Sequence, residues 1–158
     1  MGRRFVLSCP RPRFPREELV EFHRHTTSLQ ELSEIRRLVA RDLADAAIPA
    51  LSNDRRFATA YNAALQTAKM AVACAGYRVA SAPGHHRLTF GGARFALGKP
   101  AEHLTDYFDA SRRKRNEIDY TGATIATDTE ANELLLHAKS FLDMVESWIT
   151  AHHPAWKV

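Results

Sequence analysis

The stretch TDTEANELLLHAKSFLDMVESWI, residues 127–149, decides the fold of this chain. Thr127 and Glu130 stand three residues apart, the spacing of a capping box at the start of an α-helix. Apolar residues then recur at intervals of three and four, as one buried helix face requires: Ala131, Leu134, Leu135, Ala138, Phe141, Leu142, Val145, Trp148 and Ile149. We therefore predict a long amphipathic helix that ends before Pro154.

Two further helices are predicted in the first half of the chain. Ser28 and Glu31 form a second capping box, and apolar residues follow at helical spacing over 32–46. Ser52 is a suitable cap for an alanine-rich helix, and the turn signal at 81–84 follows that helix.

The remaining helices are shorter or less regular in their pattern. We expect a short helix over 17–26, and an interrupted one over 85–97, where Gly91 and Gly92 weaken both helix and strand. Pro100 suits the first turn of another helix, and Gly122 suits the left-handed conformation that ends one.

No segment shows convincing alternation of apolar and polar residues, so the prediction is an all-α fold. It would be a four- to five-helix up-and-down bundle with an irregular N-terminal arm. Residues 1–15 form this arm because of their three prolines, residues 16–153 form one bundle, and residues 154–158 are a tail.

The composition is that of a globular chain of one domain. Its 158 residues are 45% hydrophobic and 25% charged, and no apolar run is long enough to cross a membrane. The two cysteines, Cys9 and Cys74, are too few for a disulfide framework and lack the C-x-x-C spacing of zinc sites. We expect a cytoplasmic protein without export signal, membrane contact, metal or cofactor.

The net charge of +4 belongs to the N-terminal arm. Residues 1–16 hold five arginines and no acid, so the other 17 of the 22 basic residues face 18 acidic residues. Overall basicity is therefore weak support for a nucleic-acid partner, although the arm could attract RNA.

Arg115 is the residue that fits a simple bundle helix least well. It continues the apolar face of residues 104, 108 and 111, and Ile118 follows it. A guanidinium there needs a partner, and Asp119, one turn later, is the nearest acceptor in sequence. The alternative is a structural ion pair, or an arginine that reaches water past the apolar face.

Several short motifs precede and follow this arginine in a recognisable order: Tyr77-Arg78, Gly84-His85-His86, Tyr107-Phe108, Arg112-Arg113-Lys114-Arg115-Asn116 and Asp119-Tyr120. With the long C-terminal helix, they resemble the HEPN family (higher eukaryotes and prokaryotes nucleotide-binding) over roughly residues 28–152. The likeness is to the small bacterial branch with an Arg-Asn and Asp-Tyr motif. Each motif alone is weak, and their order and spacing carry the resemblance.

The resemblance implies a homodimer with the two arginine motifs across a cleft. It also implies RNA or nucleotide binding and, in many members, metal-independent endoribonuclease activity in toxin–antitoxin or defence systems. In those members a histidine follows the arginine by four to six residues, whereas positions 119–122 here are Asp-Tyr-Thr-Gly.

Cleavage of RNA through its 2′-hydroxyl needs a cation, a base and an acid. Arg115 is the candidate cation, Asp119 a candidate base or holder of Arg115, and His85 or His86 the candidate imidazole. The alternative roles for the histidine pair are a loop pair that caps the next helix and, less favoured, a metal site.

The candidate binding residues are Asn116, Tyr120 and Arg112, which can share one stripe beside Arg115. Tyr120 would stack on a base, or alternatively cover the open end of the bundle.

Two functions of different classes remain at this point. The first is an RNA- or nucleotide-binding protein, with or without nuclease activity. The second is a non-catalytic dimerisation or interaction module. The expected partners are a second copy of the chain and an antitoxin or a nucleotidyltransferase-like protein.

Overall fold

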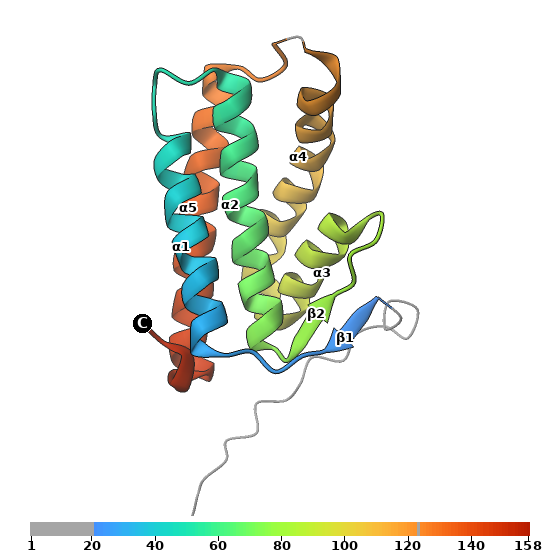
Figure 1. Ribbon diagram of the computed structural model, residues 1–158, viewed down its shortest axis with the longest axis vertical. Coiled ribbons are helices and arrows are strands. Elements are labelled where there is room, and N and C mark those ends of the chain that lie inside the picture. The colour runs from blue at the N-terminus through green and yellow to red at the C-terminus, as the bar shows by residue number, and fades with distance from the viewer. Residues whose placement is uncertain (1–20, 123) are drawn as a thin grey trace, which may run out of the picture.

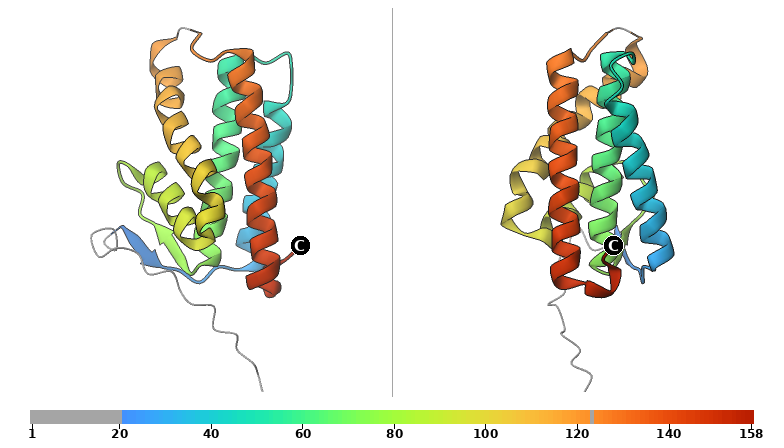
Figure 2. Two further views of the ribbon diagram at one scale, coloured as in Figure 1. Left: turned by 180° about the vertical axis from the view of Figure 1, so that it is seen from behind. Right: turned by 90° about the vertical axis from the view of Figure 1, so that its left-hand side faces the viewer.

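The computed structural model describes residues 21–122 and 124–158, and in these residues it confirms the all-α helical bundle. Figure 1 shows α1, α2 and α5 side by side, with the shorter α3 and the long α4 on the other side of α2. The C-terminal half of α4 leans away from α2, also when viewed from behind (Figure 2). The helices are α1 (Leu29–Ala46), α2 (Asn53–Cys74), α3 (His85–Leu97), α4 (Glu102–Thr121) and α5 (Asp128–His152).

The predicted N-terminal caps are present at the starts of α1, α2 and α5. Ser52 Oγ accepts a hydrogen bond from the backbone N–H of Arg55, and Thr127 with Glu130 forms the complete capping box. Ser28 Oγ accepts from the N–H of Glu31, but the Glu31 carboxylate bonds to residues before the helix instead of returning to Ser28. This second box is therefore only half formed.

A small two-stranded antiparallel sheet corrects the prediction of a helix over 17–26. Strand β1 (Phe22–Arg24) pairs antiparallel with β2 (Tyr77–Val79), with Phe22 opposite Val79. Residues 17–20 lie outside the described residues. Three-residue strands are too short to show alternation, and their pairing joins distant segments, so the sequence pattern did not reveal this sheet.

Helix α3 is continuous, against the expectation of an interruption at Gly91 and Gly92. A Cβ placed on Gly92 would lie 2.7 Å from Cε1 of Phe22 and 2.9 Å from Cγ2 of Val72. Gly92 therefore lets α3 approach both α2 and strand β1 closely. A Cβ on Gly91 would meet nothing within 4 Å.

The chain segments around α4 and after α5 differ slightly from the prediction. Pro100 lies in a 3-10 turn, Lys99–Ala101, and α4 begins just after it. Gly122, with a φ of 63°, ends α4 in the expected left-handed conformation. Within residues 154–158 another 3-10 turn, Pro154–Trp156, holds its last carbonyl against Arg36.

The core centres on α2, whose buried face consists largely of alanine. Five of these alanines have no exposed surface: Ala60, Ala63, Ala64, Ala68 and Ala71. Larger side chains of the neighbouring helices, such as Leu32, Phe90 and Phe141, fill the space that the small residues leave. Within the described part of the chain, no helix is both long and apolar enough to span a bilayer.

The two neighbouring glycines provide a test of this packing. Gly92→Ala should lower the free energy of unfolding by about 1–3 kcal/mol, because its methyl group would overlap Phe22 and Val72. Gly91→Ala, with open space at its Cβ, should raise it by up to about 1 kcal/mol through helix propensity. Urea denaturation measures both, and equal effects of the two substitutions would contradict the close approach.

Candidate functional site

Arg115 occupies the position that the sequence predicts, at the edge of the core on α4. Phe108, earlier on the same face, is buried, and Ile118 packs against the core. The Arg115 side chain is only 24% exposed and forms an ion pair with Asp119, whose side chain is 46% exposed. The Arg115 Nε is buried without a hydrogen-bond partner. The predicted pair exists, and it leaves part of the guanidinium unsatisfied.

The other cations of this segment are bound in different ways. Arg112 Nε donates to Asp109 at 3.2 Å, one turn back along α4. Lys114 pairs with Glu130 at the start of α5, and Arg113 is exposed to solvent. Lys114 therefore has a structural role, whereas the Arg112 and Arg115 side chains remain partly accessible.

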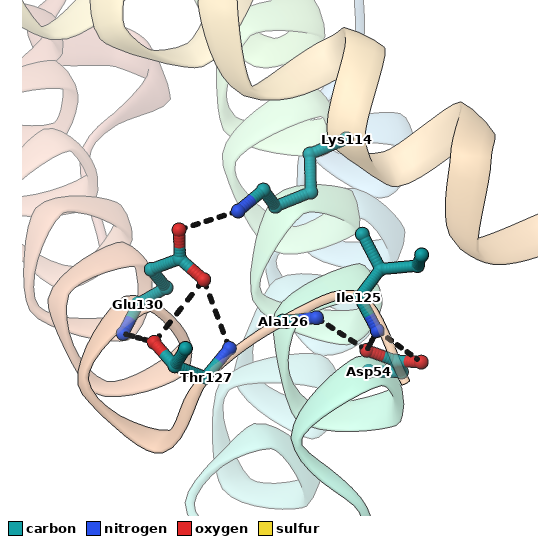
Figure 3. Close-up of polar contacts among 6 residues, drawn as sticks. All are labelled: Asp54, Lys114, Ile125, Ala126, Thr127 and Glu130. Atoms are coloured by element: carbon teal, nitrogen blue, oxygen red, sulfur yellow. Dashed lines mark hydrogen bonds and ion pairs between the residues drawn. The ribbon is translucent and has the colours of Figure 1, made fainter. Parts of the chain in front are cut away.

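The connection between α4 and α5 is anchored from two sides (Figure 3). The Asp54 carboxylate, on α2, accepts from the N–H of Ile125 at 3.0 Å and from that of Ala126 at 2.7 Å. Glu130 accepts from Lys114 and from the N–H of Thr127. These contacts hold the end of α4, and with it Arg115, relative to α2 and α5.

His86 lies within electrostatic range of Arg115, although no hydrogen bond joins them. Its Nδ1 is 3.2 Å from the hydroxyl oxygen of Tyr61 on α2. Burial is the main cause that lowers the pKa of His86 to about 4, and neighbouring His85 with the positive charges of Arg115, Lys69 and Arg112 contributes the rest. His86 is consequently neutral at pH 7 and surrounded by cationic groups.

Tyr61 completes this site and was not predicted. It has no exposed surface, and burial raises the pKa of its hydroxyl, while the charges of Arg112 and Arg115 act in the opposite direction. Side chains from α2, α3 and α4 thus lie within electrostatic range of one another here, and we call Tyr61, His86, Arg112 and Arg115 the arginine site. A tyrosine within an alanine-rich helix face was the available signal, since a buried hydroxyl requires a partner.

The surroundings of His85 differ from those of His86, although the two rings are in edge contact with their centroids 4.4 Å apart. Its Nδ1 lies 2.9 Å from the carbonyl oxygen of Ala82. A carbonyl can only accept, so Nδ1 carries the proton and Nε2 keeps a lone pair in neutral His85. His85 lines a cavity beside Lys69 and touches the arginine site through its ring contact with His86.

The remaining candidate residues differ in their exposure. Asn116 is half-buried and makes no side-chain hydrogen bond with the described residues. Tyr120 is 88% exposed, which excludes the interpretation that its ring covers the end of the bundle. It remains available for stacking.

The next histidine after Arg115 packs on another part of α4. His137 on α5 packs on Tyr107, with ring centroids 4.4 Å apart, and its Nε2 lies 3.7 Å from Glu133. Among residues 21–122 and 124–158, no group of three or more His, Cys, Asp or Glu side chains could hold a metal ion.

The lowered pKa of His86 predicts a pH dependence of stability. Between pH 6.5 and about 4 the unfolded chain binds a proton at His86 that the folded chain does not, so stability falls as the pH falls. His86→Gln should lose less stability between pH 7 and pH 5 than the wild type does. Urea denaturation at both values measures this, with exposed His23→Gln as the control. Parallel losses in all three proteins would contradict the burial of His86.

No family model, no curated protein and no solved structure matches this chain. What the arginine site can do therefore follows from its own geometry: it presents partly desolvated guanidinium groups, a neutral imidazole and a buried hydroxyl on one side of the bundle.

Proposed function

We propose that this protein is a HEPN-like homodimer that binds RNA through a backbone phosphate at the arginine site. The observation that carries the proposal is the Arg115 guanidinium, which is only partly exposed, has a buried Nε without a hydrogen-bond partner, and lies, like Arg112, within electrostatic range of His86. A guanidinium fork matches the oxygens of a phosphate, and removal from water strengthens such a contact.

Asp119 does not prevent this binding. Its side chain is about half exposed, and an exposed ion pair of this spacing contributes only about 0.3–0.5 kcal/mol. A phosphate with two accessible oxygens can therefore displace the carboxylate or share the guanidinium with it. Asp119 then holds Arg115 in place when the site is empty.

Cleavage of the bound RNA is the second part of the proposal, with His86 as the base for the 2′-hydroxyl proton. A histidine with a pKa of about 4 is a weak base. Burial is the main cause of this low pKa, but the positive charges that add to it are those that a phosphate would neutralise. Phosphate binding should thus raise the pKa of His86 toward the range useful at neutral pH. A second His86, from the other copy of the dimer, would supply the acid.

The alternative is a non-catalytic interaction module. The position of His137 favours it, because this side chain packs on Tyr107 instead of joining Arg115. Exposed Leu136 and Tyr120 also offer apolar surface to a protein partner such as an antitoxin or a nucleotidyltransferase-like protein.

RNA binding should depend on Arg115 more than on its neighbour in the charge run. Arg115→Ala should weaken the binding of single-stranded RNA at least tenfold, because it removes a charge-assisted contact worth about 1.5–3 kcal/mol. Arg113→Ala removes the same charge from the exposed side of α4 and should change the affinity by less than about threefold. Fluorescence anisotropy at fixed salt measures both, and equal losses would contradict a defined phosphate site.

The nuclease activity can be tested separately from binding. Overexpression of the wild type should arrest growth, and purified protein should cleave RNA in the presence of EDTA. Arg115→Ala, Asp119→Ala and His86→Gln should relieve both effects. RNA binding without cleavage, and without growth arrest, would favour the interaction module.

A further inference from the structure

A cavity of about 330 Å³ lies beside the arginine site, between α1, α2, α3 and strand β2. Aliphatic side chains of α1, α2 and β2 contribute to its wall: Ile35, Leu38, Val72, Ala73 and Val79. Val72 and Ala73 are almost fully buried. This volume is at the lower end of the range for small-molecule sites, which favours a ligand of roughly a dozen heavy atoms.

Lys69 is one of the cations that line this cavity. It lies on α2, four residues before Ala73, and its side chain is open to solvent. It makes no side-chain hydrogen bond or ion pair with the described residues. The surrounding protein still lowers its pKa by desolvation. An ammonium group beside apolar surface and without a counter-ion is suited to an anionic ligand.

Most other polar groups of the cavity already have partners. The Glu31 carboxylate accepts from His25 and Thr27, and the hydroxyl of Thr89 donates to the carbonyl of His85. The side chain of Gln66 makes no hydrogen bond with the described residues. Lys69 and Gln66, one turn apart on α2, therefore provide the donors that a ligand could use.

From this cavity we infer a second binding site, which takes a small monocarboxylate with an apolar body. The carboxylate lies on Lys69, with Gln66 as a further donor, and the apolar part contacts Ile35, Val72 and Val79. This inference does not depend on the function proposed for the arginine site.

The charges of the wall favour one negative charge on the ligand. Glu31 and Glu34 also line the cavity, opposite the positive charges of Lys69 and Arg78. Two carboxylates in the wall repel a phosphate dianion more strongly than a monoanion. Phosphate also has no apolar part to cover Val72 and Ile35. The cavity thus differs chemically from the arginine site in that carboxylates and aliphatic side chains line it together.

Titration of the full chain with sodium hexanoate, followed by amide chemical shifts in NMR, tests this site. We expect saturable shifts at Lys69, Val72, Val79 and His85, with a Kd of about 1 mM, a strength reasonable for so small a ligand. Hexan-1-ol and inorganic phosphate, which each lack one half of the ligand, should bind at least tenfold more weakly.

Two substitutions and a matched control complete the test. Lys69→Met, which keeps the length of the side chain, should weaken hexanoate binding at least tenfold. Ala80→Leu should weaken it comparably, because it fills the cavity without a change of charge. Lys139→Met, at an exposed position of α5, should leave the Kd within twofold. The inference is overturned if hexanoate does not saturate, if Lys69→Met binds it as well as the wild type, or if phosphate binds equally tightly at these residues.

Discussion

The small side chains on the buried face of α2 are the constraint on which the rest of this structure depends. Alanine lets α1, α3 and α5 approach the same helix closely, so α2 becomes the centre of the bundle. The large polar residues on this helix then acquire special roles. Arg56 is buried and binds the carbonyl of Ala46 and the carboxylate of Asp128, which joins the end of α1 to the start of α5. Asp54 binds the α4–α5 connection, Tyr61 belongs to the arginine site, and Lys69 lines the cavity.

The bundle could be predicted from sequence because its determinants are local. Thr127 with Glu130, Ser52 and Gly122 act on the backbone within one helical turn of themselves, and the apolar spacing of α5 follows from helix geometry alone. The two-stranded sheet could not be predicted in this way, since Phe22 becomes part of a strand only when Val79 is beside it. The continuity of α3 depends similarly on Phe22 and Val72, which turn Gly92 from a weakness into a requirement for close packing.

In the candidate site too, the contacts within one helix could be predicted from sequence, and the contacts between helices could not. Arg115 and Asp119 are one turn apart on one helix, so their pairing was predictable from spacing. The approach of His86 to Tyr61 was not, because α2 and α3 meet at an angle that depends on the whole core. The different roles of His85 and His86 have the same origin. Adjacent residues at a helix start point in different directions, and only the packed structure shows that one meets Ala82 and the cavity, and the other Tyr61.

The start of α3 lies between two groups of cations, and this position has a thermodynamic consequence. Lys69 on the cavity side and Arg115 with Arg112 on the other side all lower the pKa of His86. An anion bound to Lys69 would remove part of this effect, and so would a phosphate bound to Arg115. His86 is neutral at pH 7. The negative charge of either anion would raise the pKa of His86, and a proton taken up by His86 would in turn strengthen the binding of both anions. Linkage requires such coupling to be reciprocal, so the proton on His86 connects the two sites without any movement of the backbone.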